Sequence, residues 1–357
     1  MPKKLKVWWN FGSLMGLILV LQIVTGLFLA FHYKSSLKLA FLSIEHIIRN
    51  VKNGWLVRRF HAKGAAFFFI FIYLHIGRKI YYNLYKNKKV WNLGIIMYIL
   101  LMAIAFLGYV LPWGQMSYWG ATVITNLLSA IPYVGKKFVI WVWGGYSVGG
   151  ATLSRFYVLH FITPFILAIL TVVHIYLLHN TLSQSPLKIR KGLNYVYFHS
   201  FFTIKDLAGV RCFLIVLLSL IFFTPLIFRE PEKYIKAKRL STPLHIQPEW
   251  YFLFAYTILR SIPKKSLGIL GLLRSMLILF IFPLKKNKVV FIPNIFKFFQ
   301  QIIFWFVIFN FIVLTWLGSQ AIENPFIIIR IFISLFYFIL FIILFFWKRV
   351  SLLLNIV

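Results

Sequence analysis

Four of the nine histidines in this sequence are spaced in a way that suits metal ligation. His61 and His75 lie 14 residues apart in one apolar stretch, and His160 and His174 lie 14 residues apart in another. Fourteen residues make just under four turns of an α-helix, so each pair falls on nearly one helix face, about 21 Å apart along the axis. Buried imidazoles in a membrane are costly and usually functional, and neutral imidazole is the usual axial ligand of haem iron.

Glycines repeat this spacing in the two neighbouring apolar stretches. Gly12 and Gly26 are 14 residues apart, and so are Gly94 and Gly108. Glycine lets a flat macrocycle approach a helix backbone closely. Small residues also occur where membrane helices cross, but the period shared by all four stretches favours the haem interpretation.

Two arginines lie three residues from a histidine, Arg58 before His61 and Arg78 after His75. A guanidinium pairs well with a carboxylate, so we expect both to bind haem propionates. The competing interpretation is a polytopic transporter or assembly scaffold whose histidines only pack or form hydrogen bonds between helices, which predicts no haem. Two identical spacings on two helices favour ligation.

The composition is typical of a polytopic membrane protein. Of the 357 residues, 61% are hydrophobic and 20% aromatic, whereas a soluble domain is nearer half apolar. The net charge of +33 comes from short basic clusters between apolar runs, which indicates helix ends beside anionic lipids rather than a nucleic-acid-binding face. The single Cys212 excludes an internal disulfide and a cysteine-ligated iron–sulfur cluster.

Eight apolar runs, each bounded by charge, proline or glycine, predict an all-α integral membrane protein with eight transmembrane helices. The first four would form a four-helix bundle that holds two haems. Residues 112–155 are too broken to span and predict short helices at the membrane interface. We expect an N-terminal domain over 1–205 and a C-terminal four-helix domain over 206–357. The expected spans are 11–31, 56–82, 92–111, 156–178, 208–228, 267–283, 300–318 and 326–346.

The order of the spans pairs the histidines. Spans two and four are separated by one span, so they cross the membrane in the same direction. The first histidine of each must then face the first of the other, which pairs His61 with His160 and His75 with His174. The result is two bis-histidine haems stacked across the bilayer. Lys and Arg are nearly balanced between the two sides, so loop charge does not give the orientation.

Several long motifs occur in an order that resembles cytochrome b, the core subunit of respiratory complex III. They are WWNFGS at 8–13, GYVLPWGQMS at 108–117, PEWY at 248–251 and ILRSIP at 258–263. The resemblance covers nearly the whole chain. The respiratory branch is favoured over the chloroplast relative, which is split into two chains. Other dihaem, quinone-linked anchor subunits generally have fewer spans and lack the PEWY loop.

The resemblance implies a subunit of a ubiquinol–cytochrome c reductase that runs a Q cycle with proton translocation. Ubiquinol would be oxidised at one face, and an electron would pass through two b-type haems to reduce ubiquinone at the other. The haem of His61 and His160 would be the low-potential one, and that of His75 and His174 the high-potential one. Implied partners are a Rieske iron–sulfur subunit, a cytochrome c-type subunit, other complex III subunits, a second copy in a homodimer, and lipids such as cardiolipin. The implied location is the mitochondrial inner membrane, with the bacterial plasma membrane as the alternative and the N-terminus on the matrix side.

An acidic residue in an aromatic stretch is the candidate base for quinol oxidation. Glu249 lies between Pro248 and Trp250 and would accept a proton from bound quinol. From the residues alone a loop acid or helix cap is as good an interpretation, and the resemblance to the PEWY motif favours the catalytic one. The same resemblance places Tyr256 in that pocket, with Gly120 leaving room for the ring.

The candidate site for quinone reduction is formed by residues around the fourth and fifth spans. His179 and Ser183 follow span four, and Lys205 and Asp206 precede span five, so both connections fall on one side of the membrane. His179 can donate a hydrogen bond to a quinone carbonyl, and Asp206 with Lys205 can relay protons. Interfacial anchoring is the alternative, and all four positions match the family pattern. The loop 233–239 is more basic than is usual in the family.

Overall fold

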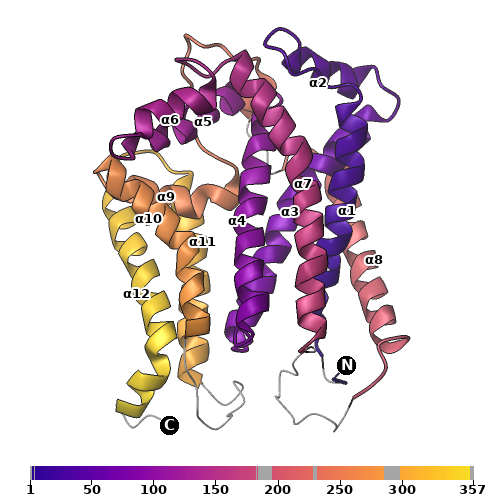
Figure 1. The fold of residues 1–357 in the computed structure, drawn as a ribbon, viewed down its shortest axis with the longest axis vertical. Helices are drawn as coiled ribbons and strands as arrows, with labels where there is room; N and C mark the ends of the chain where they lie inside the picture. The colour runs from indigo at the N-terminus through magenta and orange to yellow at the C-terminus, as the bar shows by residue number, and fades with distance from the viewer. Residues whose placement is uncertain are drawn as a thin grey trace.

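Long helices standing roughly side by side make up most of the molecule (Figure 1). The structure, a computed structural model, describes residues 2–3, 5–181, 183, 195–227, 231–284 and 298–353, with side chains as far as residue 346. Every named element in these ranges is a helix. The all-α prediction is therefore confirmed for the described part of the chain.

The first group of helices is a bundle of four. Its members are α1 (Phe11–Ala30), α3 (Gly54–Tyr81), α4 (Lys88–Val110) and α7 (Gly150–His179). Helix α1 packs along α3, and α4 packs along α7. The two helix pairs leave space between them, and this space becomes the main cavity of the molecule.

The second group lies beside the bundle (Figure 1). Helices α9, α11 and α12 pack against one another, and α10 packs on α9. Helix α8 instead packs on α1 and α3 of the first group. These elements are α8 (Phe201–Phe222), η3 (Pro231–Tyr234), η4 (Trp250–Phe252), α9 (Leu253–Ser261), α10 (Lys265–Leu277), η5 (Ile278–Leu284), α11 (Phe298–Gly318) and α12 (Phe326–Leu353).

Seven of the eight expected spans are helices long and apolar enough to cross a membrane. The remaining span, expected over 208–228, corresponds to α8. This helix has 22 residues, enough for about 33 Å at 1.5 Å per residue. It carries Lys205, Asp206 and Arg211 in its first half, so it is less apolar than the others. The helix begins at Phe201, seven residues before the expected start, and the expected end at residue 228 lies outside the described residues.

Short helices cover one end of the bundle, as the broken sequence of 112–155 predicted. They are α5 (Gln115–Asn126), η2 (Leu127–Ala130) and α6 (Gly135–Trp143). A further short helix at this end, α2 (Ala40–Arg49), follows α1 and was not expected. The two chain termini lie at the opposite end (Figure 1), as an even number of crossings requires.

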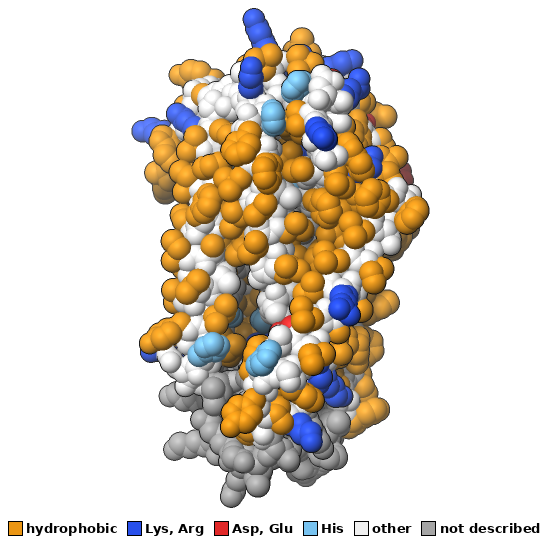
Figure 2. All heavy atoms as spheres, turned by 90° about the vertical axis from the view of Figure 1, so that its right-hand side faces the viewer, with side chains coloured by type: hydrophobic (Ala, Val, Ile, Leu, Met, Phe, Trp, Pro, Cys, Tyr) orange, Lys and Arg blue, Asp and Glu red, His pale blue; other side chains and the backbone are white. Residues whose placement is uncertain are grey.

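A belt of hydrophobic side chains surrounds the middle of the molecule. Figure 2 shows Lys and Arg mostly toward the two ends, with apolar side chains covering the face between them. Helix α7 contributes to this surface with exposed residues such as Ile169 and Val172, which are 65% and 68% exposed. A surface this apolar suits hydrocarbon rather than water.

Local signals in the sequence explain where the bundle helices begin and bend. The side chain of Asn87 accepts a hydrogen bond from the backbone N–H of Val90 and caps α4. The Thr152 hydroxyl accepts one from the backbone of Gly149 at the start of α7. Pro164 lies inside α7 and has no N–H to donate to the carbonyl of His160. The helix therefore loses a backbone hydrogen bond one turn after a candidate ligand.

Candidate functional site: two histidine pairs and an acidic pocket

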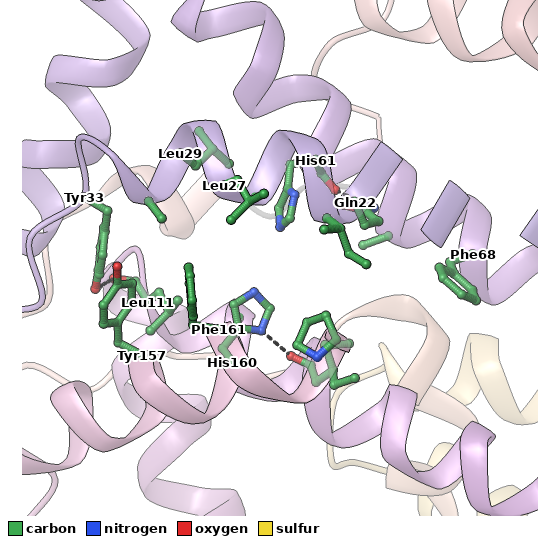
Figure 3. A pocket seen from close by; sticks show the side chains of 18 of the residues that line it. Gln22, Leu27, Leu29, Tyr33, His61, Phe68, Leu111, Tyr157, His160 and Phe161 are labelled. Carbon is green, nitrogen blue, oxygen red and sulfur yellow. Dashed lines mark hydrogen bonds between the residues drawn. The ribbon is translucent and has the colours of Figure 1, made fainter. Parts of the chain in front are cut away.

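His61 of α3 and His160 of α7 face each other across a cavity (Figure 3). Their ring centroids are 6.3 Å apart and the ring planes are nearly perpendicular, at 88°. A nitrogen that binds a metal lies about 2 Å from the ion and about 1.15 Å from its own ring centre, so two imidazoles on opposite sides of one ion have centroids roughly 6.3 Å apart. The observed spacing therefore fits one ion between the rings.

The hydrogen bonds of the two rings favour the same arrangement. Nδ1 of His61 lies 3.0 Å from the hydroxyl oxygen of Thr25, and Nδ1 of His160 lies 2.9 Å from the carbonyl oxygen of Ile104. The second bond is the dashed line in Figure 3. A backbone carbonyl can only accept, so His160 carries its proton on Nδ1. Nε2 of each ring is then the nitrogen left for a metal.

The cavity between these rings, together with its opening to the outside, takes in about 1160 Å³ of space that no protein atom fills. Leucine, isoleucine and phenylalanine side chains from all four bundle helices dominate its lining, and Arg58 and Tyr33 also reach it. A large, flat, mostly apolar ligand with a few anionic groups fits this chemistry. The donor set, the spacing of the rings and the apolar lining together fit haem.

Glycines lie directly against the ligand candidates. A Cβ placed on Gly108 would collide with the His160 ring, and one placed on Gly26 would lie 3.2 Å from Cε1 of His61. Both glycines also line the cavity. The glycines therefore leave room for the histidine rings, and their approach to a macrocycle stays a prediction.

His75 and His174 form the corresponding pair near the other end of α3 and α7. A Cβ placed on Gly12 would lie 3.7 Å from Cε1 of His75, and one placed on Gly94 would lie 3.3 Å from Cε1 of His174. Within the part of the chain that the structure describes, Nδ1 of neither ring has a hydrogen-bond partner, although both atoms are buried. In this respect the second pair differs from the first, in which Nδ1 of each ring has a protein partner.

Two cations accompany this second pair. The Arg78 guanidinium donates to the carbonyl oxygen of Trp8 at 3.3 Å and lies 4.9 Å from the ring centre of Trp9. Its Nε is buried and has no partner among the described residues. Lys79 interacts electrostatically with both His75 and His174, although no spacing or motif in the sequence pointed to it. Together they suit the carboxylates of a haem.

A second, smaller pocket of about 400 Å³ brings together Glu249, Tyr256 and Gly120. These are the three residues expected at the quinol-oxidation site. They come from different elements: Glu249 directly precedes η4, Tyr256 belongs to α9 and Gly120 belongs to α5. The Tyr256 hydroxyl donates to the carbonyl oxygen of Ile246 at 3.1 Å. Both the pocket and this hydrogen bond involve the residues just before the PEWY motif, whose backbone forms one wall.

Two aromatic residues connect this pocket to the bundle. Tyr251 stacks on Phe69 with centroids 4.0 Å apart and planes at 2°, and Phe69 lines the histidine cavity. Burial, with a smaller contribution from the neighbouring Glu249 carboxylate, holds the pKa of Tyr251 well above its usual value. Tyr251 therefore stays a neutral packing residue and cannot serve as a base at neutral pH.

The residues expected at the reduction site are only partly assembled. Ser13 of α1 donates to the Asp206 carboxylate at 3.0 Å, and the Lys205 ammonium donates to the carbonyl oxygen of Leu5 at 3.1 Å. These bonds join the start of α8 to the start of α1. His179 is exposed at the end of α7. The structure brings Lys205 and Asp206 together with α1 but does not join His179 to them.

Ser183 lies just beyond α7 and is half-buried. Residues 182 and 184–194 on either side of it lie outside the described part of the chain. The structure therefore does not connect Ser183 with the other three candidates, and its assignment stays a prediction.

Comparison with known proteins agrees with this geometry. The family model described as "Cytochrome b/b6/petB" matches residues 1–182, and the one described as "Cytochrome b(C-terminal)/b6/petD" matches residues 236–338. The chain belongs to the cytochrome b family. It is also similar to a chain of a solved structure described as "Hyperthermophilic respiratory Complex III", with 33% sequence identity and a TM-score of 0.90. That match covers 96% of this chain and 92% of the other.

Membership in the cytochrome b family supports several coarse conclusions. The chain is a multi-pass membrane protein with a respiratory electron-transfer role, and it acts as an oxidoreductase within a larger complex. The family implies binding of b-type haem.

Besides Lys79, three contributors to the histidine cavity and the acidic pocket were not expected from the sequence. Thr25 contacts His61 from α1, Ile104 contacts His160 through its carbonyl, and Lys233 contacts Glu249. Thr25 carried a weak signal, because it directly precedes one of the four spaced glycines. The Ile104 contact is made by the backbone, which no side-chain pattern can reveal. The position of Lys233 depends on the path of a loop.

Proposed function

We propose that this chain is the dihaem core of a ubiquinol–cytochrome c reductase. Quinol would be oxidised in the pocket of Glu249, electrons would cross the membrane along the bundle, and quinone would be reduced near His179, with proton translocation by a Q cycle. The observation that carries the proposal is the pair of rings of His61 and His160, 6.3 Å apart across a large apolar cavity.

Each haem would be held by one residue of α3 and one of α7. His61 and His160 would ligate the low-potential haem, and His75 and His174 the high-potential one. Bound there, the two b-type haems would supply one-electron redox chemistry at two depths of the membrane. The apolar lining would exclude water, while Arg58 and Arg78 would pair with the carboxylates.

Glu249 would act as the general base for quinol. Its carboxylate lies in an 18% exposed side chain at the wall of the smaller pocket, so it can contact a bound ring and still pass a proton outward. Tyr256 would define the pocket wall, and Gly120 would leave room for the quinol ring. On the other side of the membrane, His179 and Ser183 would bind quinone, and Asp206 with Lys205 would deliver protons.

Partners follow from the chemistry that this chain lacks. Cys212 is its one cysteine, so the second electron from quinol needs an iron–sulfur cluster on another subunit, which we propose is of the Rieske type. A cytochrome c-type subunit would take that electron onward. We also propose that the chain forms a homodimer and binds cardiolipin. The proposed location is the mitochondrial inner membrane, and the alternative is the bacterial plasma membrane. Cell fractionation distinguishes these two locations.

Optical spectroscopy of the purified complex tests the ligand assignment. The reduced-minus-oxidised spectrum should contain two b-type components per chain. His75→Ala should remove one component and His61→Ala the other, whereas His46→Ala, on the exposed face of α2, should keep both. An unchanged haem content in the His75→Ala protein would contradict the assignment, and a complex without haem would favour the scaffold interpretation.

A second measurement tests the quinol chemistry. Glu249→Gln keeps the shape of the side chain but removes its basicity, so quinol oxidation should slow by about 10²-fold or more. The haem spectrum should stay unchanged because Glu249 lies in the other pocket. Full activity of this variant would exclude Glu249 as the base.

A further inference from the structure

Glu249 is half of a partly buried ion pair. Its Oε1 atom lies 2.7 Å from the ammonium nitrogen of Lys233, and the two side chains are 18% and 16% exposed. The other ion pair in the described part of the chain, Arg49 with Glu45, is a surface pair with side chains 74% and 38% exposed. Of these two pairs, the one at the acidic pocket is shielded enough for its charges to interact strongly.

The backbone around Lys233 is fixed by the segment that starts α5. The backbone N–H of Gln115 donates to the carbonyl oxygen of Ile235 at 2.9 Å, and that of Ala237 donates to Trp113 at 3.1 Å. A Cβ on Gly114 would collide with the carbonyl of Lys233, so the glycine allows this close approach. Lys233 is thus held at a defined distance from the pocket.

The ammonium group of Lys233 also faces an aromatic wall. It lies 5.1 Å from the ring centre of Tyr109, which lines the same pocket as Glu249. Other polar residues near the carboxylate are Gln247 and Tyr256, which line the same pocket, and Tyr251. Arg260 lies one residue further out, 5.0 Å from the Tyr256 ring centre. Lys233 is the cation in direct contact with the carboxylate.

We propose that Lys233 is a positioning residue that holds the Glu249 carboxylate at the pocket wall between turnovers. The inference rests on the proposed role of Glu249 as the base. It assigns a residue of the basic loop 233–239 to that reaction.

The proton balance of the step is simple. A quinol O–H bond breaks and an O–H bond forms on Glu249, while the electrons leave by the route of the proposed function. The neutral carboxylic acid no longer attracts Lys233, so a cation remains in a shielded place without a counter-charge. Loss of the proton from Glu249 to water restores the ion pair. Lys233 therefore returns the carboxylate to the same place at the pocket wall for the next turnover.

The test compares four forms of the whole complex: the parent, Lys233→Met, Lys233→Arg and Lys236→Met. Lys236 is exposed in the same loop, so its variant controls for loss of loop charge. Lys233→Met should lower kcat for quinol oxidation at least about tenfold, as expected for a lost hydrogen bond to a charged group. KM and haem content should stay near the parent values. Lys233→Arg should retain most of the rate and Lys236→Met all of it.

A double-mutant cycle shows whether Lys233 acts through Glu249. In the Glu249→Gln background, Lys233→Met should cause no further loss of kcat, because the carboxylate that Lys233 contacts is no longer present. An equal loss in both backgrounds would overturn the inference and indicate a merely structural role. If Lys233→Met does not assemble, Lys233→Gln, which keeps a donor without charge, makes the same comparison.

Infrared spectroscopy of the resting complex without quinol separates this inference from the proposed function. The carboxylate stretching band that Glu249→Gln removes belongs to Glu249, and Lys233→Met should shift this band because the hydrogen bond from the ammonium group is lost. An unshifted band in Lys233→Met overturns the role of Lys233. A shifted band, with unchanged turnover in Glu249→Gln, instead supports the positioning role and rejects Glu249 as the catalytic base.

Discussion

Gly108 and Tyr109 are neighbours on α4 that face two different pockets. Gly108 lines the cavity between His61 and His160, and Tyr109 lines the pocket of Glu249. One turn of a single helix therefore forms the wall between the candidate haem and the candidate quinol site. A short separation of this kind suits electron transfer, and it means that one residue can be changed to disturb one pocket alone.

The first prediction concerns Gly108. In Gly108→Ala the new methyl group would collide with the His160 ring, so the imidazole must shift and ligation should weaken. We expect loss of the low-potential haem component with the other retained, measured by redox titration of the difference spectrum. Gly12→Ala is the matched control, because its methyl group would lie 3.7 Å from His75, an ordinary contact. Equal haem loss in both variants would contradict this account.

The second prediction concerns the threonine behind His61. Thr25→Val keeps the shape of the side chain but removes the oxygen that lies 3.0 Å from Nδ1 of His61. Partners of this kind orient a ligating ring, and their loss costs about 10–100-fold in metal affinity. We expect faster haem loss to an apo-globin acceptor. Thr171→Val, whose hydroxyl donates to the Leu167 carbonyl of its own helix α7, should behave like the parent.

These relationships show what the sequence could predict. The histidine pairs were predictable because a helix converts a spacing of 14 into one face and fixed depths. The pocket of Glu249, Tyr256 and Gly120 followed from a family motif, since Gly120 is far from the other two in the chain. The structure brings these three residues together in one pocket, and their role in quinol oxidation stays a prediction.

Other features depended on contacts that no local pattern encodes. Lys233 reaches Glu249 because its loop pairs with residues 113–115, more than a hundred positions earlier. The start of α8 at Phe201 was missed because Lys205 and Asp206 interrupt the apolar run, and bonds to the start of α1 accommodate their polarity. Tertiary partners, rather than helix periodicity, set both features.

The third prediction concerns a lysine that is only 2% exposed within α3. The Lys63 ammonium donates to the carbonyl oxygens of Thr224 and Ile227, just after α8. Lys63→Met should leave those carbonyls without their charged donor and destabilise the packing of α8 on α3 by about 1–3 kcal/mol. Thermal unfolding in detergent, followed by haem absorbance, should show a lower Tm. Lys52→Met, at an exposed loop position, should not change it.

The last prediction concerns the reduction potential of the haem that we assign to His75 and His174. Lys79 lies four residues after His75 on α3 and interacts with both rings. A cation stabilises the reduced, more electron-rich form of a nearby redox group. Lys79→Met should therefore lower the midpoint potential of this haem by roughly 60 mV, a tenfold change in a one-electron equilibrium.

The potential of the other haem is the internal reference for this measurement. His61 lies 18 residues before Lys79 on α3, about 27 Å along the helix axis, so the Lys79 charge acts on that haem more weakly than on the haem beside His75. The component of that haem should therefore shift less in Lys79→Met. Lys88→Met removes an exposed charge at the start of α4 and should leave both potentials unchanged. Equal shifts of the two components would indicate a change in the whole bundle and would reject a local role for Lys79.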